Sequence, residues 1–219
     1  MPRWLAGRRF GGSRAGSTVT SHPSRLIKAG RDPTPLRGSR EWPVVEPDAA
    51  LLSAPRASAK RLVLYIVCGK RGAYSEPDVQ EIIETYSATC IRVGLDPLIA
   101  VSQLILESDN LTSPKAQRPQ LDPFAIGGLM TRAGGIPFGS WSEVARIHAG
   151  LLLAYALRPG AEETTQLAFL EEALALEPLL SKVRGTAPTL GRLAAAWTRE
   201  ASYANRLRAI ANRILEPQW

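Results

Sequence analysis

The fold is decided by the stretch Gly94-Leu95-Asp96-Pro97-Leu98-Ile99-Ala100-Val101-Ser102-Gln103-Leu104-Ile105-Leu106-Glu107-Ser108-Asp109-Asn110. Asp96 is a natural N-cap, and Pro97 suits the first position of a helix. The residues that follow are apolar around most of the helix circumference, which predicts a helix that runs through a core. The polar residues after Glu107 are expected to end it.

Glu107 lies in the last turn of this expected helix. A helix C-terminus carries negative partial charge, and a partly buried carboxyl is disfavoured as an anion. Both effects raise the pKa of the carboxyl, as a general acid near neutral pH requires. A helical Glu is more often solvated or ion-paired, so its position alone does not decide between chemistry and packing.

Helices are expected along most of the remaining chain. Ser58 and Ser75 stand at natural helix starts, Ser75 with Asp78 as a capping box, and Ser140 begins another helix with Glu143 at the capping-box position. Further helices are expected at residues 162–176, around 189–197 and at 202–215. Strand alternation is absent outside residues 124–138. The predicted fold class is therefore mainly α.

The charge of the chain is unevenly distributed. Residues 1–60 hold eleven Lys or Arg against four Asp or Glu, whereas residues 61–219 hold sixteen of each. Residues 1–54 are also rich in Gly, Pro and Arg and lack an apolar period, so we expect a basic arm that is disordered alone. Residues 55–219 are expected to form one domain.

The arm suggests several partners and routes. It can contact an acidic partner, order only within an assembly, or remain a solvated tail. No clustered Arg or Lys marks a recognition helix, so specific nucleic-acid recognition is not expected. We find no secretory signal and no transmembrane stretch. Such a chain is expected to stay cytoplasmic until lysis, to belong to a phage-like particle, or to leave by an unrecognised export route.

The chain has two cysteines and two histidines, Cys68, Cys90, His22 and His148. Both cysteines fall on apolar helix faces, which favours buried free thiols over a disulfide. His148 also lies on an apolar face and is interpreted as a hydrogen-bonded core residue. No cluster has the spacing of a metal site, so neither a metal nor a cofactor is expected.

Four segments in order resemble the glucosaminidase-type peptidoglycan hydrolases of the lysozyme superfamily. They are the helix that ends in Glu107, then Asp122-Pro123-Phe124-Ala125-Ile126-Gly127-Gly128, Phe138-Gly139-Ser140-Trp141-Ser142-Glu143-Val144-Ala145-Arg146-Ile147-His148 and Trp197-Thr198-Arg199-Glu200-Ala201-Ser202-Tyr203-Ala204. The chain departs from the family at Asp109, Asp122, Ala125 and Trp197. These stand where the family has Gly, Asn, Gly and Tyr, respectively.

The resemblance implies a lysozyme-like domain with a central helix, a short hairpin or loop rim at residues 108–139, and Glu107 as general acid. Asp109, Asp122 and Glu143 are the possible second acids, and Glu143 has the alternative interpretation of a helix cap. The residues implied for substrate binding are Asn110, Phe124, Ile126, Trp197 and Tyr203. Trp197 and Tyr203 have a competing interpretation as core packing.

The function implied is cleavage of the β-1,4 glycan of bacterial peptidoglycan, by hydrolysis or by a lytic transglycosylase route. Whether the bond cut is that of a glucosaminidase or a muramidase stays open. The alternative is a weak or inactive lysozyme-like domain that binds glycan or serves as a structural part of a phage-like particle.

Overall fold

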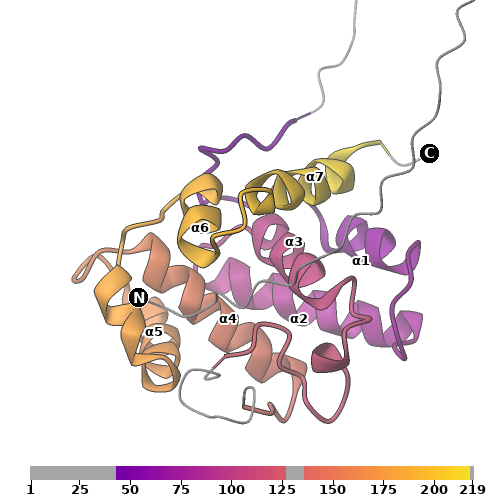
Figure 1. Cartoon of the computed structure of the whole chain (residues 1–219), viewed down its shortest axis with the longest axis horizontal. Helices are drawn as coiled ribbons and strands as arrows, with labels where there is room; N and C mark the ends of the chain where they lie inside the picture. The colour runs from indigo at the N-terminus through magenta and orange to yellow at the C-terminus, as the bar shows by residue number, and fades with distance from the viewer. Residues whose placement is uncertain (1–42, 127–135, 218–219) are drawn as a thin grey trace, which may run out of the picture.

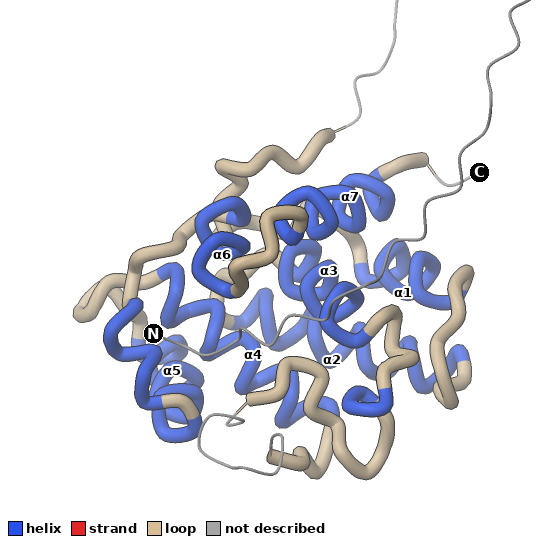
Figure 2. Tube along the Cα trace, in the orientation of Figure 1, coloured by secondary structure: helices blue, strands red, loops and turns tan. Residues whose placement is uncertain are grey.

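The computed structural model describes residues 43–126 and 136–217, and in these ranges the protein is helical (Figures 1 and 2). The elements are α1 (Ala59–Val67), α2 (Glu76–Arg92), α3 (Pro97–Ser108), α4 (Trp141–Ala156), α5 (Thr164–Leu176), α6 (Leu190–Trp197) and α7 (Tyr203–Leu215), with short 3-10 helices η1 (Pro114–Ala116) and η2 (Pro178–Val183). The mainly α prediction is confirmed. The η2 turn was not predicted.

The predicted helix starts are confirmed by their caps. The Ser58, Ser75 and Ser140 side chains each accept a hydrogen bond from a backbone N–H three residues on. At Ser75 the reciprocal bond from its backbone N–H to the Asp78 carboxylate completes the capping box. These local bonds satisfy N–H groups that a helix start otherwise leaves unpaired.

Helix α3 is the centre of the fold. Ten of its twelve residues are buried, and α1, α2, α4 and α7 all pack against it (Figure 1). Its start is fixed by Asp96, whose carboxylate accepts the Leu98 N–H at 3.0 Å and pairs with Arg56 at 2.5 Å. Because Asp96 is itself buried, this pairing offsets the cost of removing its charge from water.

The contact between α4 and α5 depends on a glycine. A Cβ built on Gly150 would lie 2.2 Å from the Phe169 carbonyl oxygen on α5. No side chain fits at that separation, so Gly150 permits the close approach of the two helices. The contact holds α4, which carries His148, against the outer layer of the domain.

Residues 43–52, which we term the N-terminal strap, pack as part of the domain (Figure 1). Val45 and Leu51 are buried, and the Val45 N–H donates to Asn212 on α7 at 2.7 Å. The strap also bonds to the residues that start α6 and to Asp96 before α3. The boundary predicted between residues 54 and 55 therefore leaves out part of the core, to which the buried side chains of Val45 and Leu51 belong.

A chain that begins at Ser53 should be less stable than the full chain by about 3–5 kcal/mol. It loses two fully buried aliphatic side chains, each worth roughly 1.5–3 kcal/mol, and the bonds that hold α6 and α7. Urea unfolding followed by circular dichroism measures the difference. A chain that begins at Pro43 is the control, and equal midpoints for the two shortened chains would contradict the role of the strap.

The two cysteines lie in different environments. Cys90 is buried as predicted, but Cys68 is exposed, because it caps the end of α1 instead of facing the core; both are free thiols.

The centre of the predicted hairpin and residues 1–42 of the arm lie outside the described ranges. Residues 124–126 and 136–138 form no strand. None of the described helices has the length and apolarity needed to cross a membrane.

Candidate functional site

Glu107 receives two hydrogen bonds from the C-terminal helices. The Trp197 indole Nε1 donates to Glu107 Oε1 at 2.8 Å, and the Tyr203 hydroxyl donates to the same oxygen at 2.6 Å. Trp197 ends α6 and Tyr203 begins α7, so the turn between these helices presents both donors to the last turn of α3. The structure thus brings together three of the residues singled out in the sequence.

The carboxyl of Glu107 is partly buried, and burial raises its pKa above the usual range for Glu. The hydrogen bonds from Tyr203 and Trp197 and the positive charge of Arg206 lower the pKa and offset part of this rise. A carboxyl with this balance keeps its proton closer to neutral pH than a solvated Glu does. That is the property required of a general acid.

A further carboxylate, Glu200, acts on Glu107 through its charge and raises the pKa of Glu107. Glu200 is exposed and accepts hydrogen bonds from Ser202 at 2.5 Å and Arg206 at 3.0 Å, which lower its own pKa. It therefore remains an anion beside the site. Glu200 belongs to the fourth segment of the resemblance, which implies no role for it.

Behind Tyr203 a chain of buried polar groups continues into the core. The Gln103 amide Nε2 donates to the Tyr203 hydroxyl oxygen at 3.2 Å, and Gln103 Oε1 lies 3.1 Å from His148 Nε2. Gln103 and His148 are both fully buried. The burial of His148 confirms the prediction from its apolar helix face. Gln103 was not predicted, although a polar amide within an apolar helix was the available signal.

Three of the residues predicted to bind substrate, Phe124, Ile126 and Trp197, line one apolar pocket of about 170 Å³. Phe124 stacks on His148 with ring centroids 3.9 Å apart and meets the Trp197 ring edge to face at 6.1 Å. Trp197 is only 9% exposed. Trp197 therefore packs into the core and also bonds to Glu107, while its role in substrate binding stays a prediction.

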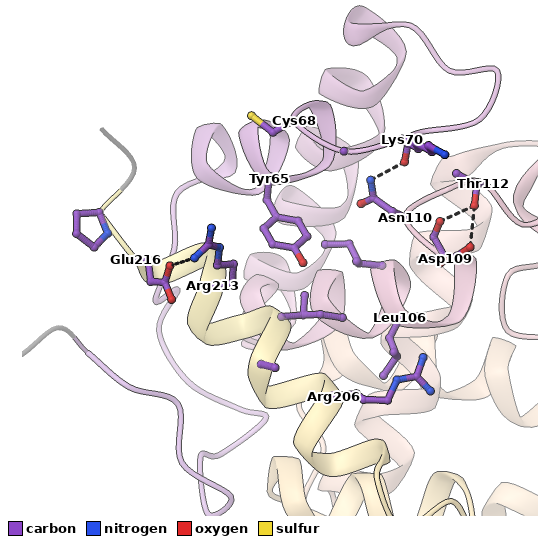
Figure 3. A pocket seen from close by; sticks show the side chains of 15 residues that line it. Tyr65, Cys68, Lys70, Leu106, Asp109, Asn110, Thr112, Arg206, Arg213 and Glu216 are labelled. Atoms are coloured by element: carbon purple, nitrogen blue, oxygen red, sulfur yellow. Dashed lines mark hydrogen bonds and ion pairs between the residues drawn. The ribbon is translucent and has the colours of Figure 1, made fainter. Parts of the chain in front are cut away.

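Asp109 and Asn110 lie elsewhere, in a pocket of about 1050 Å³ between α1, the end of α3 and α7 (Figure 3). Both have left-handed backbone conformations that end α3. The Asn110 amide donates to the carbonyls of Ile66 and Lys70 and so ties down the chain after α1. Glu107 does not line this pocket, and the Asn110 donors are used in the fold.

The other two predicted second acids have structural partners. The Asp122 carboxylate is 0% exposed and accepts the Ile126 N–H at 2.9 Å. Glu143 is exposed at the start of α4, where its carboxylate accepts the Gly139 N–H at 2.9 Å. The structural interpretation of Glu143 agrees with this contact, but the carboxylate bonds to the residue before the N-cap and does not close a capping box on the Ser140 N–H. The contacts of both acids fix local turns.

Among the described residues no group of three or more His, Cys, Asp or Glu side chains could hold a metal ion. Comparison of the chain with protein-family models, with curated protein sequences and with solved structures gave no significant match. We therefore infer the kind of site from the geometry of its residues.

Asp122→Asn should stabilise the protein above pH 6 and leave it almost unchanged near pH 4. Burial raises the pKa of Asp122 from 3.8 to about 6. The folded state therefore holds this proton more tightly than the unfolded state, and its stabilising effect is lost as the pH rises from 4 through 6. The full effect is at most about 3 kcal/mol, at 1.36 kcal/mol per pH unit.

The gain expected is about half of that limit, because Asn keeps the Oδ1 acceptor for Ile126 but places a new buried N–H where Oδ2 has no partner. Urea unfolding at pH 4, 5, 6 and 7 gives the free energies. Asp109→Asn, an exposed change, is the control. A difference between wild type and Asp122→Asn that does not vary with pH would contradict the assignment.

Proposed function

We propose that the protein is a glycosidase that cleaves the β-1,4 glycan of bacterial peptidoglycan, with Glu107 as its general acid. The observation that carries the proposal is the partly buried carboxyl at the end of α3, with a raised pKa and two donors on one oxygen. The four ordered segments that resemble glucosaminidase-type hydrolases support the substrate class. We extend the proposal to a lysozyme-like arrangement of the domain.

In the proposed reaction Glu107 transfers its proton to the glycosidic oxygen as the bond to the leaving sugar breaks. The transition state is oxocarbenium-like and needs a second group that activates water or stabilises charge. Of the acids considered, Glu200 is the anion that acts on Glu107 electrostatically. We therefore add Glu200 to the candidates for this role, beside substrate-assisted and lytic transglycosylase routes that need no second carboxylate.

The apolar pocket beside Trp197 supports binding of an apolar part of the substrate close to the proposed acid. Phe124 and Ile126 also line this pocket, and in this proposal they contact the substrate there. Bacterial cell walls would become accessible to such an enzyme after lysis, from a phage-like particle, or by an export route. The arm would then serve as a contact to an acidic partner.

One observation favours the alternative, a lysozyme-like domain that binds glycan without turnover. The contacts of Asp109, Asp122 and Glu143 are used locally, at a helix end, a buried turn and a helix cap. If Glu200 does not supply the second group, the site holds an acid without a partner. Such a domain would bind cell walls and leave them intact.

Glu107→Gln should lower the turnover of purified peptidoglycan by roughly 10²–10⁴-fold, the usual contribution of general-acid catalysis. Gln has almost the same shape and can still accept the Trp197 and Tyr203 hydrogen bonds, so the fold should persist. Release of reducing ends, with mass analysis of the fragments, measures the turnover and identifies the bond that is cut.

Glu171→Gln is the matched control, because it makes the same chemical change at an exposed position of α5 that is not among the candidate acids. Its turnover should equal that of the wild type. Wild-type turnover in Glu107→Gln would refute the general acid. A wild-type protein that sediments with cell walls but releases no reducing ends would establish the binding alternative instead.

A further inference from the structure

The buried polar groups behind Glu107 form a chain in which each bond has one direction. Burial lowers the pKa of His148 to about 3, so the ring is neutral and carries one N–H. Its Nδ1 is buried without a partner, whereas Nε2 faces Gln103 Oε1 at 3.1 Å. The oxygen of an amide only accepts, so His148 Nε2 is the donor of this pair.

Gln103 transmits this direction to Tyr203. With its Oε1 occupied by His148, the amide must present Nε2 to the Tyr203 oxygen, at 3.2 Å. The Tyr203 hydroxyl therefore accepts from Gln103, and its own hydrogen is left to donate to Glu107 Oε1 at 2.6 Å. Burial and the adjacent Glu107 raise the pKa of Tyr203, so the hydroxyl keeps its hydrogen.

The chain has a consequence for Glu107. Its Oε1 accepts from Tyr203 and from Trp197, and two donors fill the two lone pairs of a carboxyl oxygen. A proton on that oxygen would displace one donor and leave a buried N–H or O–H without a partner, which is costly. The neutral carboxyl must therefore carry its proton on the other oxygen, Oε2.

We propose that Gln103 and His148 are positioning residues that fix the direction of the Tyr203 hydroxyl and so confine the proton of Glu107 to Oε2. That this proton is the one transferred to a glycosidic oxygen rests on the function proposed above. The direction of the chain does not rest on it. In an active enzyme the arrangement would present a single oxygen as the proton donor at every turnover.

Other charged groups that act on Glu107 do not set this direction. Arg206 and Glu200 influence Glu107 through their charges, with opposite effects on its pKa, and they bond to each other at 3.0 Å. Among the described residues, neither Arg206 nor Glu200 forms a hydrogen bond to Glu107 Oε1 or to Tyr203. A variant that removes the His148 or Gln103 hydrogen bond therefore changes the direction of the Tyr203 hydroxyl and leaves the charges of Arg206 and Glu200 in place.

The test follows the titration of Glu107 by NMR of the full chain with ¹³C-labelled Glu side-chain carboxyls, the signal being assigned by its loss in Glu107→Gln. His148→Phe keeps a ring against Phe124 and removes the donor to Gln103, while His148→Gln keeps a donor there. We expect His148→Phe and Gln103→Met to raise the titration midpoint of Glu107 by about half a pH unit, and Tyr203→Phe by about one or more, because each weakens or removes a hydrogen bond to the anion. His148→Gln should stay close to wild type.

A second measurement needs no variant. The ¹⁵N shifts of His148 in the wild-type protein report its tautomer, which should be Nε2–H across pH 5–8. An Nδ1–H tautomer would reverse the chain and overturn the proposal, as would a Glu107 midpoint that stays at the wild-type value in folded His148→Phe and Gln103→Met.

Both measurements are independent of turnover. If Glu107→Gln digests cell walls normally, the proposed function fails while the shifted midpoints and the tautomer still establish the directed chain. If the protein is active, the alkaline limb of its pH profile should move to higher pH in His148→Phe, since the acid must be protonated to act.

Discussion

The structure depends on the enclosure of α3. A helix that is apolar around most of its circumference cannot leave a broad face in water, so other elements must cover most of it. Helices α1, α2, α4 and α7 do so, and the N-terminal strap joins the start of α3 to α6 and α7. Glu107 lies where this enclosure ends, so its carboxyl is only partly buried and its pKa is raised.

The same enclosure explains the polar groups around the carboxyl. An amide within a buried helix has no water to bond, so Gln103 needs protein partners at both of its ends. His148 and Tyr203 provide these partners, and the Tyr203 hydroxyl in turn donates a hydrogen bond to Glu107. One set of bonds thus satisfies the buried amide of Gln103 and also fixes a donor on Glu107.

Much of the fold was readable from local patterns. Ser75 and Ser140 start helices through bonds to backbone three residues away, and the uninterrupted apolar run predicts the burial of α3. The strap was missed because Val45 and Leu51 lie in a short stretch that prolines interrupt and that has no helical period, and they are buried by contacts far along the chain. For the same reason the sequence suggested Tyr203 and Trp197 near Glu107 only through a family resemblance, and it gave Gln103 no partner at all.

The two bonds to Glu107 join residues that lie 90 and 96 positions apart in the chain. A ribosome releases α3 long before the segments that hold Trp197 and Tyr203, and closing so long a loop costs entropy that only the finished core repays. In an unfinished chain, Glu107 is therefore an ordinary carboxylate that lacks the Trp197 and Tyr203 hydrogen bonds. The raised pKa of Glu107 and its two hydrogen-bond donors are therefore properties of the completed fold alone.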